Sequence, residues 1–136
     1  MYEGVAEAVK DFPLLEELEL SQCDNVGGSE VFEIVGELCP QLKHFKLNKK
    51  LFNYRVWRKD DDIRGIATMH GLRSLQLLSN HLTHEGLETI LNNCPHLESL
   101  DIRNCFNVDM DVLQMCARMK TLKLPGEAID DFDLEF

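Results

Sequence analysis

Residues 72–80 read LRSLQLLSN and residues 97–105 read LESLDIRNC, and the two stretches place apolar side chains at the same three positions. The spacing is apolar, two variable residues, apolar, one variable residue, apolar, and it is found three more times. The five copies begin at residues 15, 42, 72, 97 and 119, so they are separated by 27, 30, 25 and 22 residues. Self-similarity at periods of roughly 20–50 residues is typical of stacked repeat architectures. The sequence therefore predicts a repeat protein.

Each repeat combines a strand pattern with a helix pattern. The last two apolar residues of every copy lie two positions apart, so they share one face of a short β-strand. Between the copies, apolar residues recur at i, i+3, i+4 and i+7, which lays a stripe along a helix. The clearest stripes are Val5-Ala8-Val9-Phe12, Val31-Ile34-Val35-Leu38 and Leu87-Ile90-Leu91-Cys94. Ser29 and Thr83 stand at N-cap positions, and Pro13, Pro40 and Pro95 follow the stripes. The order strand, turn, helix predicts an α/β solenoid with parallel strands on its concave face and helices on its convex face.

A small residue, Cys23, Asn80 or Cys105, stands eight positions after three of the five starts, where it fits the turn that leaves the strand. The combination L-x-x-L-x-L-x-x-C, with Cys-Pro shortly before the next leucine, resembles the cysteine-containing class of leucine-rich repeats in F-box proteins. The stretches that look most like the repeat region of plant F-box/leucine-rich-repeat proteins are residues 12–23 (FPLLEELELSQC), 42–50 (LKHFKLNKK) and 80–108 (NHLTHEGLETILNNCPHLESLDIRNCFNV).

The resemblance implies a role in ubiquitin-dependent protein degradation. In that family an F-box docks on the adaptor of an SCF-type ubiquitin ligase, while the repeats hold the protein that is to be ubiquitinated. Residues 3–12 already read as the second half of a repeat, so we expect no F-box before Leu15. We therefore expect a protein substrate on the concave face, and contact with the SCF adaptor only if an upstream F-box is present. The alternative is a free-standing interaction scaffold unrelated to ubiquitination.

The domain division follows from the repeats. We expect residues 1–126 to form a leucine-rich-repeat domain of four to five repeats that begins with a half-repeat, and residues 127–136 to form an acidic tail. The strand around Leu18 would then have one unpaired edge, which predicts marginal stability or self-association.

The candidate partner-binding residues lie beside the inward-facing leucines. Positions that alternate with buried ones point to the opposite face of a strand, and solenoids commonly bind partners on that face. The predicted concave-face residues are Glu17, Glu19, His44, Lys46, Gln76, Asp101, Arg103 and Lys123. Asn48 and Leu78 are expected on the same face. The other interpretation is that these are solvated residues whose mixed charges offset one another across strands.

Residues 43–59 form a second candidate, a basic-aromatic segment. It holds seven basic residues, no acidic residue and four aromatic residues. Such a segment can stack on single-stranded RNA or dock an acidic partner. The interpretation that we favour is a lengthened loop, because Asp60, Asp61 and Asp62 follow at once and would both neutralise it and cap the next helix. Its weaker candidate partner-binding residues are Lys50, Tyr54, Trp57 and Arg58.

Composition argues against several other functions. The formal net charge of -10 over 136 residues opposes nonspecific binding to nucleic acid or anionic membranes. No apolar stretch reaches the roughly 18–20 residues of a membrane span, and the start lacks a signal peptide, so we expect a location in the cytoplasm and/or nucleus. The five cysteines are odd in number and lie among apolar residues, which favours buried, reduced thiols.

No chemical site emerges from the sequence. His81, His84, Cys94 and His96 do not match the ligand spacing of zinc sites, and Cys94 falls on a buried helical stripe. We find no nucleophile paired with a base and no phosphate-binding loop. We therefore expect no catalytic residue, metal or cofactor.

Overall fold

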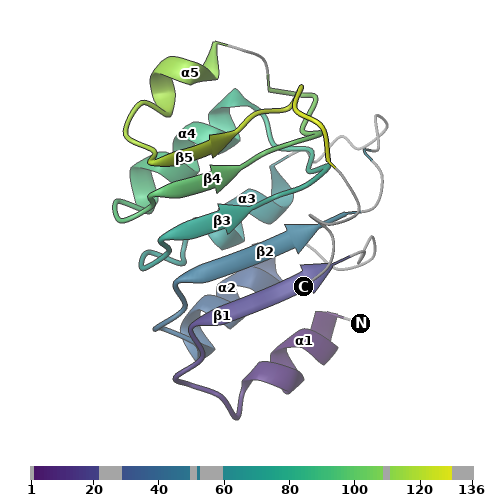
Figure 1. The fold of residues 1–136 in the computed structure, drawn as a ribbon. Helices are drawn as coiled ribbons and strands as arrows, with labels where there is room; N and C mark the ends of the chain where they lie inside the picture. Colours follow the sequence, from purple (N-terminus) through teal and green to yellow (C-terminus); the bar gives the residue numbers. More distant parts are fainter. Residues whose placement is uncertain (1, 22–28, 50–51, 53–59, 109–110, 130–136) are drawn as a thin grey trace.

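Five parallel strands form one sheet, with helices packed along the face that lies behind it in Figure 1. A computed structural model describes residues 2–21, 29–49, 52, 60–108 and 111–129. The strands are β1 (Glu17–Ser21), β2 (His44–Asn48), β3 (Ser74–Gln76), β4 (Ser99–Asp101) and β5 (Thr121–Lys123). The helices are α1 (Tyr2–Val9), α2 (Ser29–Leu38), α3 (Asp61–Ile66), α4 (His84–Asn93) and α5 (Val112–Met115). The strands follow one another in chain order across the sheet, and each helix packs on its neighbours in the row, which confirms the predicted leucine-rich-repeat solenoid.

The register of the sheet follows the repeat. Leu18, Phe45, Leu75, Leu100 and Leu122 are direct cross-strand partners. Phe45, Leu75 and Leu100 are fully buried, whereas Leu18 and Leu122 are only half-buried. The difference arises because β1 and β5 lie at the edges of the sheet and have one neighbouring strand each. The repeated leucines thus form one interior layer, as the sequence predicts.

Helix α2 buries Val31 and Val35 of its predicted stripe and partly buries Leu38, but it differs from the prediction at Ile34. Ile34 is 36% exposed, and Phe32 is fully buried in its place. The ring of Phe32 packs edge-on against Phe45 of β2, with 5.5 Å between the centroids. A ring is larger than an isoleucine side chain, so the helix turns its aromatic residue toward the sheet and moves Ile34 to the margin. The stripe of α4 is buried as predicted.

Helix α1 ends earlier than its apolar stripe. The helix stops at Val9, and the backbone N–H of Phe12 bonds to the carbonyl of Val9 in a tight turn. This turn rotates the chain, so Phe12 is 58% exposed rather than part of the buried stripe. Leu14, two residues further on, is 70% exposed.

The turns after the strands confirm the role predicted for the small residue there. Ser79 and Asn104 have positive φ angles of 59° and 61°, and each precedes that residue. The Asn80 side chain accepts the backbone N–H of Leu82 at 2.9 Å, and the Cys105 thiol donates to the carbonyl of Leu77 at 2.8 Å. The prediction for Leu78 is wrong: it is 1% exposed, because the chain has already begun to turn toward the interior.

One acidic residue acts differently from the prediction. Asp60 is the N-cap residue of α3, yet its side chain makes no cap hydrogen bond there. Its carboxylate instead accepts the backbone N–H and the hydroxyl of Thr83, at 2.7 and 2.6 Å. Thr83 in turn caps α4 as predicted, by accepting the N–H of Gly86 at 3.3 Å. Asp60 therefore joins two successive repeats, since the turns before α3 and α4 stack on each other.

The described cysteines are buried free thiols, as the sequence predicts. They are Cys39, Cys94, Cys105 and Cys116. Cys94 donates to the carbonyl of Met69 at 3.5 Å in the preceding repeat. Burial raises the pKa of each of these thiols, to about 11 for Cys94. These groups therefore act as small packing residues at the junctions between repeats. Cys23 lies outside the described residues.

Candidate protein-binding face

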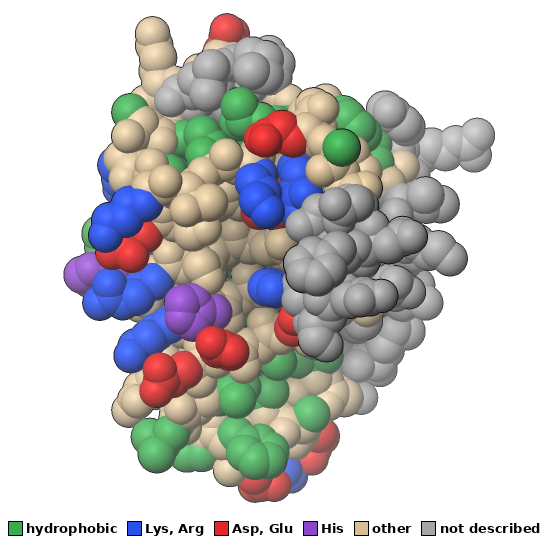
Figure 2. All heavy atoms as spheres, in the orientation of Figure 1, with side chains coloured by type: hydrophobic (Ala, Val, Ile, Leu, Met, Phe, Trp, Pro, Cys, Tyr) green, Lys and Arg blue, Asp and Glu red, His purple; other side chains and the backbone are tan. Residues whose placement is uncertain are grey.

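The strand register places two columns of polar side chains on the sheet face turned away from the helices, here called the concave face. Figure 2 shows charged and histidine side chains gathered on this side of the molecule. One column is Glu17, His44, Ser74, Ser99 and Thr121. The other is Glu19, Lys46, Gln76, Asp101 and Lys123. They align because each repeat places its strand at the same point of the apolar pattern. The columns contain seven of the eight residues predicted from the sequence, and Arg103 lies just beyond β4.

Accessible side chains of β1 and of the first part of β2 pair across strands. The Lys46 ammonium lies 3.9 Å from the Glu19 carboxylate, and both side chains are about one-third exposed. His44 Nδ1 is 2.6 Å from the hydroxyl of Ser74. Glu17 at the edge is exposed. This half of the face thus offers charged and hydrogen-bonding groups to solvent, and ion pairs so exposed hold their partners only weakly.

A hydrogen-bonded network occupies the other half. Asn48 donates to Gln76 at 2.7 Å, and Gln76 donates to Asp101 at 2.9 Å. Arg103 binds the same carboxylate through Nε at 2.9 Å and Nη2 at 2.7 Å. Such bidentate pairs are among the strongest side-chain hydrogen bonds. The network therefore fixes the orientation of Gln76, which is the member that remains half-exposed.

The predicted exposure of Asp101 and Arg103 is wrong. Asp101 is 7% exposed and Arg103 3% exposed. The cause is the segment after β5, because the carbonyl of Ala128 accepts a hydrogen bond from Arg103 Nη1 at 3.0 Å. Asn48, also expected on the open face, is 1% exposed. The alternation of apolar and polar residues predicts correctly which face of the strand each side chain is on. It contains no information about a distant segment that folds back over that face. Residues 127–129 of the expected tail thus contact the repeats, and residues 130–136 are not described.

The described part of the basic-aromatic segment is already engaged within the chain. Lys43 lies 3.3 Å from the carboxylate of Glu16, and Lys49 lies 3.1 Å from that of Asp62. Phe45 is in the core, and Phe52 packs against Phe106 with 5.3 Å between centroids. These contacts agree with the favoured loop interpretation. The candidates Lys50, Tyr54, Trp57 and Arg58 lie outside the described residues, so their role stays a prediction.

The Lys49–Asp62 pair belongs to a buried polar cluster that the sequence did not reveal. Asn80 donates to the same Asp62 oxygen at 3.3 Å. His81 stands beside these groups, and its pKa is lowered, first by burial and then by the Lys49 charge. Its Nε2 atom has no hydrogen-bond partner among the described groups. The only signal in the sequence was the run of three aspartates after the basic segment.

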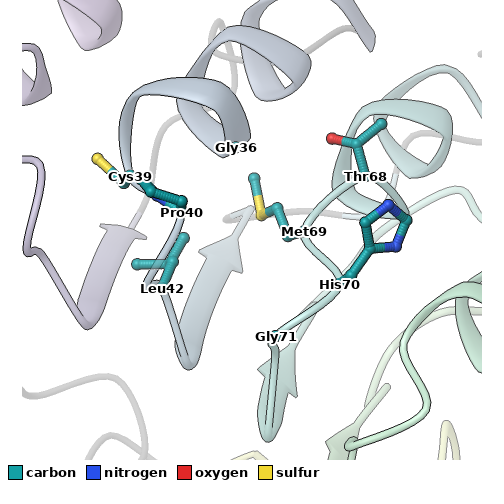
Figure 3. A pocket seen from close by; sticks show the side chains of 8 residues that line it. All are labelled: Gly36, Cys39, Pro40, Leu42, Thr68, Met69, His70 and Gly71. Carbon is teal, nitrogen blue, oxygen red and sulfur yellow. The ribbon is translucent and has the colours of Figure 1, made fainter.

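A small pocket of about 190 Å³ lies where α2 and the turn after α3 meet the starts of the strands (Figure 3). It is lined by Gly36, Cys39, Pro40, Leu42, Thr68, Met69, His70 and Gly71. Thr68 bonds to the carbonyl of Gly65, and His70 to that of Asn93. The volume is below the ~300–1,000 Å³ of typical ligand pockets, and no concave-face residue lines it. We therefore place the candidate site on the sheet.

The described part of the chain contains no group of three or more His, Cys, Asp or Glu side chains arranged to hold a metal ion. None of its helices combines the length and the apolar character needed to cross a membrane.

Comparison with curated proteins finds relatives along almost the whole chain. The chain is 44% identical over 134 residues to F-box/LRR-repeat protein 22 of Arabidopsis thaliana, with 96% of this chain and 42% of that protein covered. F-box/LRR-repeat protein 23 of the same plant is 45% identical over 135 residues, with 94% and 29% covered. F-box protein SKIP19, also from Arabidopsis, is 43% identical over 136 residues, with 97% and 43% covered. The chain thus spans less than half the length of these relatives. No family model matches it.

Among solved structures, the tropomodulin C-terminal domain from Caenorhabditis elegans is similar, with a TM-score of 0.60. The match covers 97% of this chain and 86% of that domain at 17% sequence identity. At this identity the likeness concerns the fold alone.

Proposed function

We propose that this leucine-rich-repeat chain, similar along almost its whole length to part of several plant F-box/LRR-repeat proteins, is a protein-binding domain of that kind of protein. More specifically, it is the substrate-recognition part of an SCF-type ubiquitin ligase. In this role the concave face holds the protein to be degraded, and an F-box elsewhere in the full protein binds the adaptor. The role requires binding only, with no catalytic group in the repeats.

The observation that carries the proposal is the alignment of accessible polar side chains on β1, β2 and β3. Glu17 and His44 are direct cross-strand partners, as are Glu19 and Lys46. The strand spacing of ~4.8 Å places such groups in a regular array that a partner can contact simultaneously. Beneath them, the buried leucines hold the strands rigidly, so little ordering of the face is needed on binding.

The first experiment tests the link to ubiquitination. A full-length protein with its upstream region is purified beside the present chain, and retention of the SCF adaptor is measured. We expect the full-length protein to retain the adaptor and the present chain to lose it. If neither retains the adaptor, the chain is a free-standing interaction scaffold instead.

The second experiment tests the concave face. His44→Ala with Lys46→Glu changes two accessible positions of the columns, while Arg64→Glu on the outer surface of α3 is the control. The measurement is co-purification of proteins that accumulate when the proteasome is inhibited. Proteins that co-purify with the wild type should no longer co-purify with the concave-face variant but should still co-purify with the control. Equal recovery from both variants would refute binding through this face.

The same proposal includes a location in the cytoplasm or nucleus. Four free, buried thiols support a reducing compartment, because disulfides form mainly in oxidising ones. Imaging of a fluorescent fusion of the full protein tests this, and secretion would contradict it.

A further inference from the structure

Charge is distributed unevenly between the two sides of the molecule. Most acidic side chains of α1, α2 and α4 are exposed, and these are Glu7, Glu30, Glu33, Glu37, Glu85 and Glu88. Lys10, directly after α1, pairs with Glu7 of that helix, and Arg64 pairs with Asp61 within α3. The helical side is therefore acidic, and it accounts for much of the net charge of -10.

The starts of β3, β4 and β5 form a basic rim, defined here as Arg73, Glu98 and Lys120. Arg73 Nη1 lies 3.5 Å and Lys120 Nζ 3.4 Å from the same oxygen of Glu98. The two cations thus share one carboxylate, and their side chains are 51% and 76% exposed. Figure 2 shows several Lys and Arg side chains, with acidic and histidine side chains among them, along the left edge where the strands begin. The rim carries a positive excess in an acidic protein.

Among the described residues, the acid of β4 does not compensate this excess. That acid, Asp101, is buried and bound by Arg103. The hydroxyls of Ser99 and Thr121 are aligned beside the rim and supply hydrogen-bonding groups, whereas that of Ser74 in the same column already bonds to His44. Positive charge combined with aligned donors is the combination that binds carboxylates.

The acidic residues of β1 limit how far an anionic partner can extend. Glu17 and Glu19 lie two to four strand spacings from the rim, or roughly 10–19 Å at ~4.8 Å per strand. The rim itself spans two spacings, about 10 Å, which equals about three residues of an extended chain. A long polyanion such as RNA would run from the rim onto the carboxylates of β1 and be repelled there. A short acidic cluster would not.

We propose that the basic rim binds a short acidic segment of the partner protein, with two or three Asp or Glu residues placed over β3, β4 and β5. Toward β1 the segment continues with neutral or basic residues, because it meets Glu17 and Glu19 there. This inference rests on the proposed function, since it names the chemistry of the substrate segment held by the same face. The acidic helices repel the segment and so help to orient it.

The test is an NMR titration of the ¹⁵N-labelled chain with a synthetic peptide that carries Asp-Glu-Asp in a Gly-Ser background. We expect shifts of the amide signals of residues 73–74, 98–99 and 120–121, weakening as salt is raised because the contacts are exposed. The Asn-Gln-Asn version of the peptide should cause no such shifts. The inference is overturned if the signals stay unchanged, if the shifts centre on residues 43–49, or if oligouridine moves the rim signals more strongly.

Paired variants make the test specific. Arg73→Glu with Lys120→Glu should weaken peptide binding roughly tenfold or more, whereas Lys10→Glu with Arg64→Glu makes the same change in net charge on the helices and should leave it nearly unchanged. Equal weakening by both pairs would mean that only net charge matters and would overturn the inference.

The variants also separate this inference from the proposed function. One possible result is that a cellular partner no longer binds His44→Ala with Lys46→Glu but still binds Arg73→Glu with Lys120→Glu. This result would refute the role of the basic rim and leave the proposed function standing. A partner kept by both would refute binding through the concave face, and a partner lost by both supports the two proposals together.

Discussion

Removal of the Asp101 carboxylate is expected to destabilise the fold strongly, although Asp101 was predicted from the sequence to be a binding residue. The carboxylate accepts two hydrogen bonds from the Arg103 guanidinium, one from the Arg103 backbone N–H at 3.2 Å and one from Gln76. Asp101→Ala would leave the Arg103 charge at a site where the side chain is 3% exposed. Breaking a buried ion pair by removing one partner costs about 3–5 kcal/mol.

This cost is a large part of the total stability. Domains of this size have a free energy of unfolding of about 5–15 kcal/mol, so the variant would lose about a fifth of it at the least. Glu19→Ala is the matched control, because Glu19 occupies the same column but its pair with Lys46 is solvent-accessible and 3.9 Å long. Exposed pairs contribute about 0–1 kcal/mol. The double variant Asp101→Leu with Arg103→Met removes both charges and should recover most of the loss.

Urea unfolding followed by circular dichroism measures these differences from the midpoint and slope of each transition. We expect the free energy of unfolding to be lowest for Asp101→Ala, higher for the double variant, and close to the wild-type value for Glu19→Ala. If Asp101→Ala and Glu19→Ala lose the same free energy of unfolding, the Asp101–Arg103 pair is solvated and its assignment as a structural pair is wrong.

Four other outcomes are expected. Leu100→Asp should leave the chain unfolded as judged by circular dichroism, since it buries a carboxylate where the leucine is 1% exposed. Leu100→Ala should lower the free energy of unfolding by about 2–5 kcal/mol. A folded Leu100→Asp variant would contradict the placement of Leu100 in the common interior layer. Gly86→Ala should lower the melting temperature, because the added Cβ would collide with the Asp60 carboxylate. If this collision is the cause, adding Asp60→Gly to the Gly86→Ala variant should recover part of the lost melting temperature. Because burial raises the pKa of the Cys94 thiol to about 11, the folded state binds its proton more tightly than the unfolded state, and stability should fall as the pH rises from about 9 to about 11; an equally steep fall in Cys94→Ala would show that another group is responsible. Burial lowers the pKa of His81 below 6.5, so the unfolded state binds the proton more readily and stability should decline as the pH falls through that value, less so in His81→Phe.

The concave-face prediction succeeded where it depended on local alternation. The L-x-L pairs fix which side chains point inward, so Glu19, Lys46 and Gln76 could be assigned to one face and one column before any coordinates. It failed for Asp101 and Arg103, because their exposure depends on Ala128, a residue 25 positions beyond Arg103. Alternation determines the direction of a side chain relative to its own strand, but burial depends on every segment that lies above it.

The sequence by itself determined the architecture, because a repeated apolar pattern has one way to bury all its copies, in a stack of neighbouring units. It also determined the register, since the pattern aligns Leu18, Phe45 and Leu75 without further information. Only the tertiary structure decided which charges remain available to a partner. Arg73 and Lys120 are 47 positions apart in the chain and share a carboxylate only because a single strand, β4, lies between their strands in the sheet. Electrostatic interactions act through distance in space, and net charge or local sequence contains no record of that distance.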